Sequence, residues 1–216
     1  MRKVKLYGKE VVINHANMVL THPVNYLAKA FLILSGCRVK DIYSEIDTEI
    51  LRNTSYGYYD ERIICLLSIA EDRRFLYHHG LDFYAVIRST ISTIFLRNVQ
   101  GASTIEMQLA RVIRNDYERT VIRKVREIVA ANYLSQKLNK HQIASIYLNS
   151  AYYGVGVQKE TLLALSQDFD NNLPEICKII SHIKYPNRSC PTSDWTRKVF
   201  RRANYLEYLY SQNCEK

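Results

Sequence analysis

A glutamate at the end of an apolar segment is the first feature of this sequence that can do chemistry. Glu71 follows the apolar run 61–70, ERIICLLSIA, and opens the segment EDRRFLYHHGLD. A carboxylate at the end of a buried helix loses contact with water, which raises its pKa toward the range that a general acid or base needs. Glu71 is therefore a candidate general base. The alternative is a helix-end glutamate that simply pairs with Arg73 or Arg74.

A second glutamate lies next to two cations further along the chain, in the segment RKVRE. On a helix, Arg123 and Glu127 are i,i+4 neighbours, and Lys124 and Glu127 are i,i+3 neighbours. A carboxylate flanked by two cations stays ionised, and such a group can organise a binding site for a pyrophosphate. The alternative is an exposed, salt-bridged helix surface, in which each pair contributes roughly 0.2–0.5 kcal/mol.

A third candidate site lies at the start of a predicted helix. Ser103 and Glu106 have the spacing of a capping box with Ser103 as the N-cap, which predicts a helix over 104–114. Gln108 and Arg111 are i,i+3 neighbours on this helix. A helix N-terminus can bind an anion, and capping and anion binding use the same end of the helix.

Helices must position these candidates, because the chain is poor in turn residues. It has 7 glycines and 4 prolines in 216 residues, too few for the many turns of an all-β fold. The segment 83–97 is apolar and rich in β-branched residues, so its pattern fits a helix or a strand. The hydrophobic pattern predicts further helices at 61–70, 120–138, 140–150, 174–184 and 195–211.

The charge balance points to a polyanionic partner. The net charge is +9, and residues 61–160 carry 14 Lys and Arg against 9 Asp and Glu. Such an excess suits a nucleic acid, a pyrophosphate or an anionic membrane surface, although charge alone fits a basic protein without such a partner equally well. Because no nucleic-acid-binding motif is present, no nucleic-acid partner is expected.

The cysteines and histidines give little sign of a metal. No two cysteines have CxxC spacing, so neither a zinc site nor a redox dithiol is indicated. We expect free thiols, which suit a reducing compartment. His78 and His79 can act as ligands, but a histidine in a fold is more often structural. The five cysteines are Cys37, Cys65, Cys177, Cys190 and Cys214.

The N-terminal region shows neither a signal peptide nor a membrane span. Its first residues are basic but lack an apolar core. The most apolar stretch, Tyr26–Cys37, is shorter than the roughly 20 residues that a span needs, and Lys29 interrupts it. We expect this stretch either to be a core helix or to lie in a membrane interface.

Four segments, in chain order, resemble the motifs of the peptidoglycan glycosyltransferases, which are the transglycosylase domains of class A penicillin-binding proteins and their monofunctional relatives. The first motif, ED-x-x-F-x-x-H-x-G-x-D, is complete at 71–82, and the third, R-K-x-x-E, at 123–127. The second, of the type G-G-S-T-I-T-Q-Q, reads GASTIEMQ at 101–108. The fourth, K-x-x-I-L-E-x-Y-L-N, reads KHQIASIYLN at 140–149. A weaker terminal match, RRANYL, lies at 201–206.

This resemblance implies a mostly α, two-lobed, lysozyme-like domain over 61–211, preceded by an N-terminal extension over 1–60. It implies polymerisation of lipid II into glycan strands, with inversion and release of undecaprenyl pyrophosphate. Glu71 matches the general base that deprotonates the 4-hydroxyl of the acceptor sugar. Glu127 matches a second essential glutamate, which holds the pyrophosphate region of the donor directly or through a metal. The implied substrate-binding residues are Asp72, His78, Ser103, Thr104, Gln108, Arg111, Arg123, Lys124, Tyr147 and Asn149.

The resemblance also implies a cofactor and partners. A divalent cation, Mg²⁺ or Mn²⁺, is an expectation that rests on the family alone, with Glu127 as its candidate ligand. The expected partners are lipid II, the growing glycan chain, an anionic membrane contacted peripherally and other cell-wall synthesis proteins. The expected location is the outer face of a bacterial cytoplasmic membrane. Because no signal peptide or transmembrane segment is visible, a cytoplasmic location stays open.

Five positions depart from the family pattern and keep other functions open. Glu106 stands where threonine is common, Met107 replaces the first glutamine, and Ser145 replaces the glutamate of the fourth motif. Ala102 replaces the second glycine, and Arg111 replaces a lysine with a change of geometry. The alternatives are a catalytically impaired relative that binds a lipid-linked precursor or a partner protein, and a lysozyme-like cell-wall hydrolase.

Overall fold

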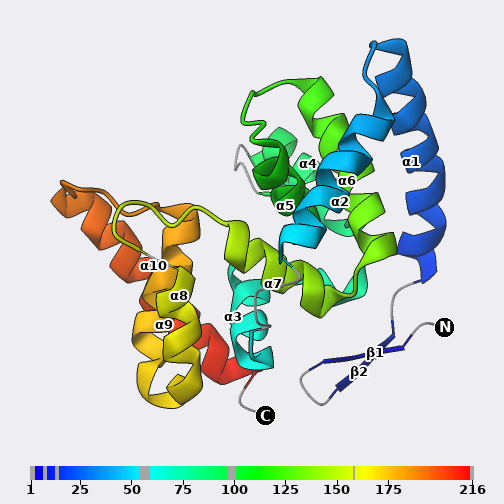
Figure 1. Ribbon diagram of the computed structural model, residues 1–216. Coiled ribbons are helices and arrows are strands. Elements are labelled where there is room, and N and C mark those ends of the chain that lie inside the picture. The colour runs from blue at the N-terminus through cyan, green and yellow to red at the C-terminus, as the bar shows by residue number, and fades with distance from the viewer. Residues whose placement is uncertain are drawn as a thin grey trace.

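The protein is helical throughout most of its described length. The computed structural model describes residues 3–6, 9–12, 15–53, 59–96, 101–157 and 159–214. The mostly α class is confirmed (Figure 1). The α-helices are α1 (His15–Leu34), α2 (Val39–Asn53), α3 (Glu61–Glu71), α4 (Phe83–Leu96), α5 (Ile105–Arg114), α6 (Val121–Lys137), α7 (Lys140–Ser150), α8 (Lys159–Leu165), α9 (Phe169–Lys184) and α10 (Ser193–Asn213).

Several elements were not predicted from the sequence. Strands β1 (Lys3–Leu6) and β2 (Lys9–Val12) form an antiparallel hairpin near the N-terminus. Helices α2 and α8 and two short 3-10 helices, Phe75–Tyr77 and Ser166–Asp168, were not predicted either. The apolar segment whose pattern fitted a helix or a strand is helix α4.

The helices pack in two groups that α7 connects (Figure 1). One group contains α1, α2, α5 and α6, and the other contains α3, α9 and α10, with α8 against α9. Helix α7 packs against α5 in the first group and against α3 in the second. A continuous apolar core joins the groups, and Ile46, Leu109, Leu148, Ile180 and Leu206 all belong to it. Helix α3 is thus joined to the first group through α7.

Helix α5 begins one residue later than the capping-box prediction. Its N-cap is Thr104, whose Oγ1 accepts a hydrogen bond from the Met107 N–H at 3.2 Å and donates one to the Gly80 carbonyl at 2.7 Å. The predicted N-cap, Ser103, lies outside the helix. Glu106 is fully buried and does not cap the helix. The prediction was wrong because two adjacent hydroxyl residues fit the motif and tertiary contacts selected the second.

A glycine allows the segment after α3 to lie directly against α6. Gly80 has a φ of +75°, and a Cβ atom there would lie 2.6 Å from the Ala131 carbonyl oxygen. A side chain at this position would thus meet both backbone strain and a clash. This close approach fixes the 3-10 helix Phe75–Tyr77 and the adjoining His78 next to α5 and α6.

A disulfide corrects the prediction that all the cysteines are free. Cys65 in α3 is bonded to Cys214, which follows α10. The sequence separation of 149 residues gives no sign of this pairing, because only the packing of α10 on α3 brings the two residues together. Cys37, Cys177 and Cys190 are free. The bond joins the helix that ends at Glu71 to the C-terminal helix.

The N-terminal helices share the core of the helices that follow them. Leu32 of α1 and Ile42 and Ile46 of α2 are buried in the main apolar cluster. Placing 1–60 apart as an extension stays a prediction. Among the described residues, no helix is both long and apolar enough to span a membrane.

Candidate active site

A pocket of about 280 Å³ opens beside the end of α3. Four of the residues that the sequence singled out line it: Glu71, Asp72, Ser103 and Thr104. The motif around Glu71 and the N-terminus of α5, 32 residues apart in the chain, therefore meet in one hollow. Its wall is also rich in arginines, which are Arg73, Arg74, Arg88 and Arg202.

Glu71 is the last residue of α3 and is largely buried, with its side chain 12% exposed. Burial raises the pKa of Glu71 above its ordinary value, because the ionised carboxylate loses its water. The positive charge of Arg202 and a side-chain hydrogen bond with Gln108 oppose this shift without cancelling it. The result is a carboxyl group that accepts a proton more readily than an exposed glutamate does. The pairing with Arg73 or Arg74, offered as the alternative, is not what the structure shows.

The partner of Glu71 is Arg202, which the sequence analysis did not place in the site. Its Nη2 donates to Glu71 Oε1 at 2.7 Å and to the carbonyl oxygen of Ala70 at 2.9 Å. A signal for this role is present in the sequence. Val199 and Leu206 are buried residues of α10, and Arg202 lies three or four positions from each of them. Arg202 is therefore on the same face of the helix, so its side chain is expected to point toward the protein.

Glu127 lies on α6 and is surrounded by cations. Arg111 Nε donates to Glu127 Oε1 at 2.7 Å, and Arg123 Nη1 donates to the same oxygen. Lys124 Nζ donates to Glu127 Oε2 at 3.1 Å. The three cations, Arg111, Arg123 and Lys124, are called the cation cluster below. The sequence predicted the two contacts within α6, and tertiary packing added Arg111 from α5.

The cation cluster and Glu127 change one another's ionisation. Burial alone would raise the pKa of Glu127, but the hydrogen bond from Arg111 and the charge of Lys124 outweigh it, and the pKa is lowered. For Lys124, burial and the nearby arginines lower the pKa, although Glu127 opposes them. Glu127 thus stays a carboxylate whose charge is shared by three cations, an arrangement that leaves net positive charge for an anionic ligand.

Ser103 connects the pocket to the cation cluster. It lines the pocket with Glu71, and its Oγ accepts a hydrogen bond from Lys124 Nζ at 2.7 Å. Gln108 extends the contacts toward α7, since the Tyr147 hydroxyl donates to Gln108 Oε1 at 2.8 Å. Burial raises the pKa of Tyr147, so this hydroxyl keeps its proton. Apart from Asn149, the predicted residues therefore belong to one continuous polar region around the two glutamates.

Asn149 lies apart from the pocket lining. Its Oδ1 accepts a hydrogen bond from the Tyr59 hydroxyl at 3.1 Å. Ser145, which replaces the family's glutamate, lies one turn earlier and its Oγ accepts from the Tyr59 N–H at 3.4 Å. Both side chains thus hold the start of the segment leading into α3. Their role in substrate binding stays a prediction.

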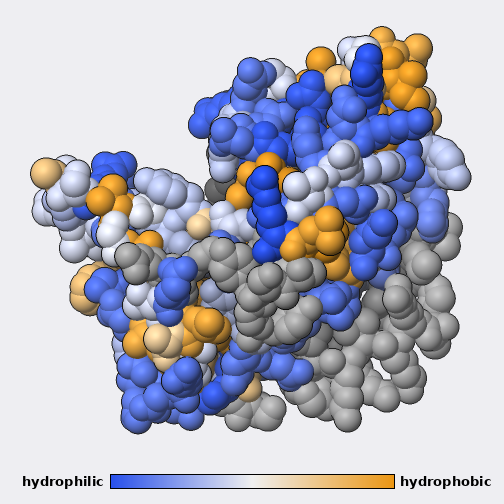
Figure 2. Space-filling view, in the orientation of Figure 1, coloured by the Kyte–Doolittle hydropathy of each residue, from blue (hydrophilic) through white to orange (hydrophobic). Residues whose placement is uncertain are grey.

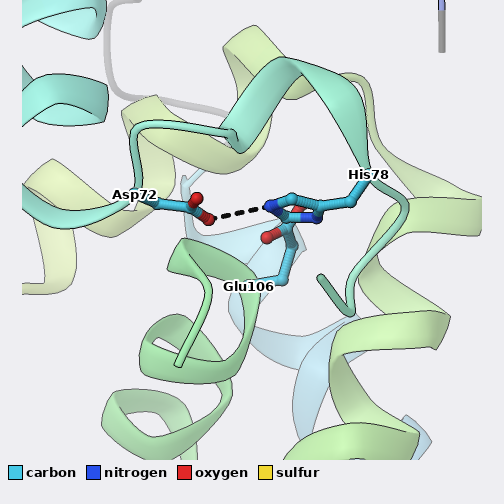
Figure 3. A group of neighbouring side chains, drawn as sticks. All are labelled: Asp72, His78 and Glu106. Atoms are coloured by element: carbon cyan, nitrogen blue, oxygen red, sulfur yellow. Dashed lines mark hydrogen bonds and ion pairs between the residues drawn. The ribbon is translucent and has the colours of Figure 1, made fainter. Parts of the chain in front are cut away.

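Asp72 and His78 form a buried pair next to the candidate base. His78 Nε2 is hydrogen-bonded to Asp72 Oδ2 at 2.9 Å (Figure 3). The same carboxylate accepts from the backbone N–H of Ile105, at the start of α5, at 3.3 Å. Burial would raise the pKa of Asp72, but His78, Lys140 and the Ile105 N–H together lower it. Asp72, which directly follows Glu71, therefore connects the end of α3 to the start of α5.

Glu127 is poorly suited to the divalent cation that the resemblance implies. Three cationic side chains already hydrogen-bond its two oxygens. A metal ion there would be repelled by three positive side chains, and only one carboxylate would attract it. The arrangement around Glu127 thus does not fit a metal, and Mg²⁺ or Mn²⁺ stays an expectation on which no step is built.

A family model matches most of the chain. The model of the transglycosylase family matches residues 40–208, and the chain belongs to this family. The match starts within the stretch 1–60 that was predicted to be an extension.

Two curated relatives are the monofunctional glycosyltransferases of Staphylococcus epidermidis and Staphylococcus aureus. Each is 43% identical to this chain over 84 residues. The match covers 39% of this chain and 31% of each relative, so this chain spans less than a third of the length of the relatives it matches.

Proposed function

We propose that the protein is a peptidoglycan glycosyltransferase that polymerises lipid II into glycan strands, with inversion and release of undecaprenyl pyrophosphate. The observation that carries this proposal is Glu71, a largely buried glutamate with a raised pKa that lines a pocket whose Ser103 contacts the cation cluster. A proton acceptor and a site for a polyphosphate are thus joined in one region. The two helix groups joined by α7 support the two-lobed, lysozyme-like arrangement.

Glu71 acts as the general base in this proposal. It takes the proton of the 4-hydroxyl of the acceptor sugar as that oxygen attacks the anomeric carbon of the donor. The bond between this carbon and the pyrophosphate oxygen breaks on the opposite face, which inverts the configuration. Arg202 keeps the carboxylate in place and offsets part of its desolvation, which favours the ionised form that takes the proton.

The cation cluster stabilises the leaving pyrophosphate. Negative charge grows on the leaving group as the bond breaks, and cations that are already in place stabilise it without reorganisation. Glu127 fixes the two arginines and Lys124, and Lys124 also reaches Ser103 at the pocket. Lipid II and the growing chain are the proposed substrates, and other cell-wall synthesis proteins are proposed partners.

An apolar face on α1 supports a peripheral contact with an anionic membrane. Leu27 and Leu34 of α1 are 71% and 88% exposed, and Tyr26 and Ile33 lie beside them. In Figure 2, hydrophobic atoms gather at the upper right, over the end of this helix. Lys29, the only residue of α1 among Asp, Glu, Lys and Arg, lies over the Tyr43 ring rather than outward.

This apolar face suits a helix that lies in the membrane interface. Helix α1 is 20 residues long and packs on α6, and its exposed apolar side chains could enter the interface while the rest of the protein stays outside the membrane. The net charge of +9 adds attraction to anionic lipids. The disulfide between Cys65 and Cys214 suits an oxidising compartment, which supports the outer face of the membrane as the location.

A polymerisation assay tests the proposed function. Full-length protein with labelled lipid II and detergent should form glycan polymer, and Glu71→Gln should stop it. Glu175→Gln, an exposed glutamate paired with Lys178, is the matched control and should keep full activity. Lipid II binding without polymer by the unmodified protein would contradict the proposal and favour a non-catalytic relative. Release of soluble muropeptides from purified cell wall would contradict it in favour of a hydrolase.

Vesicle sedimentation tests the membrane contact. The unmodified protein should sediment with vesicles that contain anionic phospholipid, and Leu27→Glu with Leu34→Glu should reduce this binding. Phe200→Glu, at an apolar position of α10 that is 59% exposed, is the control and should bind normally. Equal binding by all three proteins would exclude α1 as the contact.

A further inference from the structure

Three side chains with oxygen or nitrogen ligand atoms converge next to the pocket, in a cluster apart from Glu127. They are Asp72 after α3, His78 after the 3-10 helix and Glu106 in the first turn of α5 (Figure 3). Their candidate ligand atoms all lie within 4.8 Å of one another. His78 and Glu106 are 0% exposed. Three separate segments thus deliver one imidazole and two carboxylates to one buried point.

Two atoms of this cluster have no hydrogen-bond partner within the described part of the chain. They are Glu106 Oε2 and His78 Nδ1, and both are buried. A buried polar atom without a partner usually costs about 1–3 kcal/mol, so folded proteins seldom keep one without a purpose. The free Glu106 Oε2 indicates that a bound group is needed to satisfy it, and His78 Nε2 and Asp72 Oδ2, which lie 2.9 Å apart, are close enough to bind the same group.

The charge of the cluster indicates that this group is a cation. Lys140 Nζ donates to Glu106 Oε1 at 2.5 Å and lies over the Phe75 ring at 4.2 Å. One ammonium therefore faces two carboxylates, those of Asp72 and Glu106. Its contact uses one oxygen of Glu106 and leaves the other free for a second cation. When His78 is neutral, as a metal ligand must be, the buried negative charge exceeds the positive charge, which is unfavourable until a cation balances it.

We propose that Asp72, His78 and Glu106 bind one divalent transition-metal ion of the Zn²⁺ or Mn²⁺ type. One imidazole and two carboxylates form a donor set that such ions accept, whereas Mg²⁺ prefers oxygen ligands and keeps several waters. Lys140 and the Ile105 N–H, which hydrogen-bond Glu106 and Asp72, hold the two carboxylates in place from outside. Asp72 also lines the pocket, so an ion reaches the cluster from there.

The carboxylate of Glu106 distinguishes this site from the family pattern. Threonine is common at this position in the family pattern, and threonine provides no carboxylate. A metal here ties the residue that follows Glu71 to the start of α5, and so holds the candidate base relative to Ser103. The site does not depend on the proposed glycosyl transfer, because it is defined by ligands and burial alone.

Equilibrium dialysis of the full-length protein with Zn²⁺, Mn²⁺ and Mg²⁺ tests the site. All proteins carry Cys190→Ser, because exposed Cys190 can bind Zn²⁺ on its own. We expect one equivalent of Zn²⁺ or Mn²⁺, weaker binding of Mg²⁺ and a higher melting temperature with the bound ion. Glu106→Gln should weaken binding at least roughly 10-fold, since the loss of even an outer partner of a metal does so. Glu175→Gln is the matched control and should bind as before.

Two further measurements keep the test decisive if Glu106→Gln folds poorly. Glu106→Thr introduces the residue common in the family and should also lose the ion while keeping the helical circular-dichroism spectrum. Co²⁺ in place of Zn²⁺ should give visible absorption that His78→Gln changes. The absence of stoichiometric binding, or binding that all three variants leave unchanged, would overturn the proposal.

Discussion

The surroundings of Glu71 and Glu127 differ although the two residues are chemically identical. Glu71 ends a helix at a pocket, has one cationic partner in Arg202, and its pKa is raised by burial. Glu127 lies in the middle of α6, its side chain is 3% exposed, and its pKa is lowered by the cation cluster. Position in the fold therefore decides which glutamate can exchange a proton and which stays charged.

This difference assigns a separate task to each glutamate. Two carboxylates whose environments move their pKa values in opposite directions commonly divide the roles of proton transfer and charge stabilisation. Glu71 suits proton transfer, since its carboxylate is desolvated and can take up a proton. Glu127 suits the second role, because it organises cations for an anionic group.

The largest effect is expected at the candidate base. Glu71→Gln keeps the shape and the contact with Arg202 but cannot accept a proton, so the polymerisation rate should fall about 10²–10⁴-fold. Urea unfolding should show little change in the free energy of unfolding, because the raised pKa of Glu71 means that its ionised form costs stability in the fold, and relief of this cost offsets the loss of the ion pair with Arg202. A rate within a factor of about three of the unmodified protein would remove Glu71 from the role of base.

The second largest effect is expected on the free energy of unfolding when Glu127 is replaced. Glu127→Gln leaves the cation cluster without its carboxylate, so the free energy of unfolding should fall by about 3 kcal/mol, as when a buried ion pair loses one partner. Urea unfolding measures this change, and Glu71→Gln serves as the comparison. An equal loss of stability in both variants would show that the two environments do not differ as described.

The disulfide should stabilise the region around Glu71 more than the region around Glu127. Cys65→Ser with Cys214→Ser removes the link between α3 and α10 and should lower the free energy of unfolding by about 2–4 kcal/mol. Hydrogen exchange should increase in α3 and α10, where Glu71 and Arg202 meet, and change little in α6 around Glu127. Faster exchange that is equal in all three helices would contradict this local role.

The smallest effect is a shift in pH dependence. Arg202 lowers the pKa of Glu71, so Arg202→Met should raise that pKa further above its ordinary value. The acid limb of the pH profile of kcat/KM should then move to higher pH, because Glu71 must lose its proton before it can act. Arg201→Met, the neighbouring residue on the exposed side of α10, is the control. An acid limb that stays in place would show that Arg202 does not tune the base.

Much of the helical plan and part of the site follow from local sequence. The periodicity of α6 and α7, and the spacing of Arg123, Lys124 and Glu127, depend on residues within a few positions of one another. The register of α5 was predicted one residue early, because Ser103 and Thr104 are equally good caps by sequence. Helix α2, with little apolar excess, and the N-terminal hairpin gave too weak a pattern to be predicted.

The residue types and the motif spacing by themselves determined the helical class, the family resemblance and the choice of Glu71 and Glu127. These properties depend on residue types and on the spacing of residues that are close together along the chain, and both can be read directly from the sequence. Tertiary structure alone decided that Arg202 meets Glu71, that Cys65 bonds Cys214, and that Glu106 faces Asp72 and His78. Those contacts join segments separated by 28 to 149 residues. Burial, charge balance and disulfide pairing depend on how such distant segments pack, and the local pattern does not encode that packing.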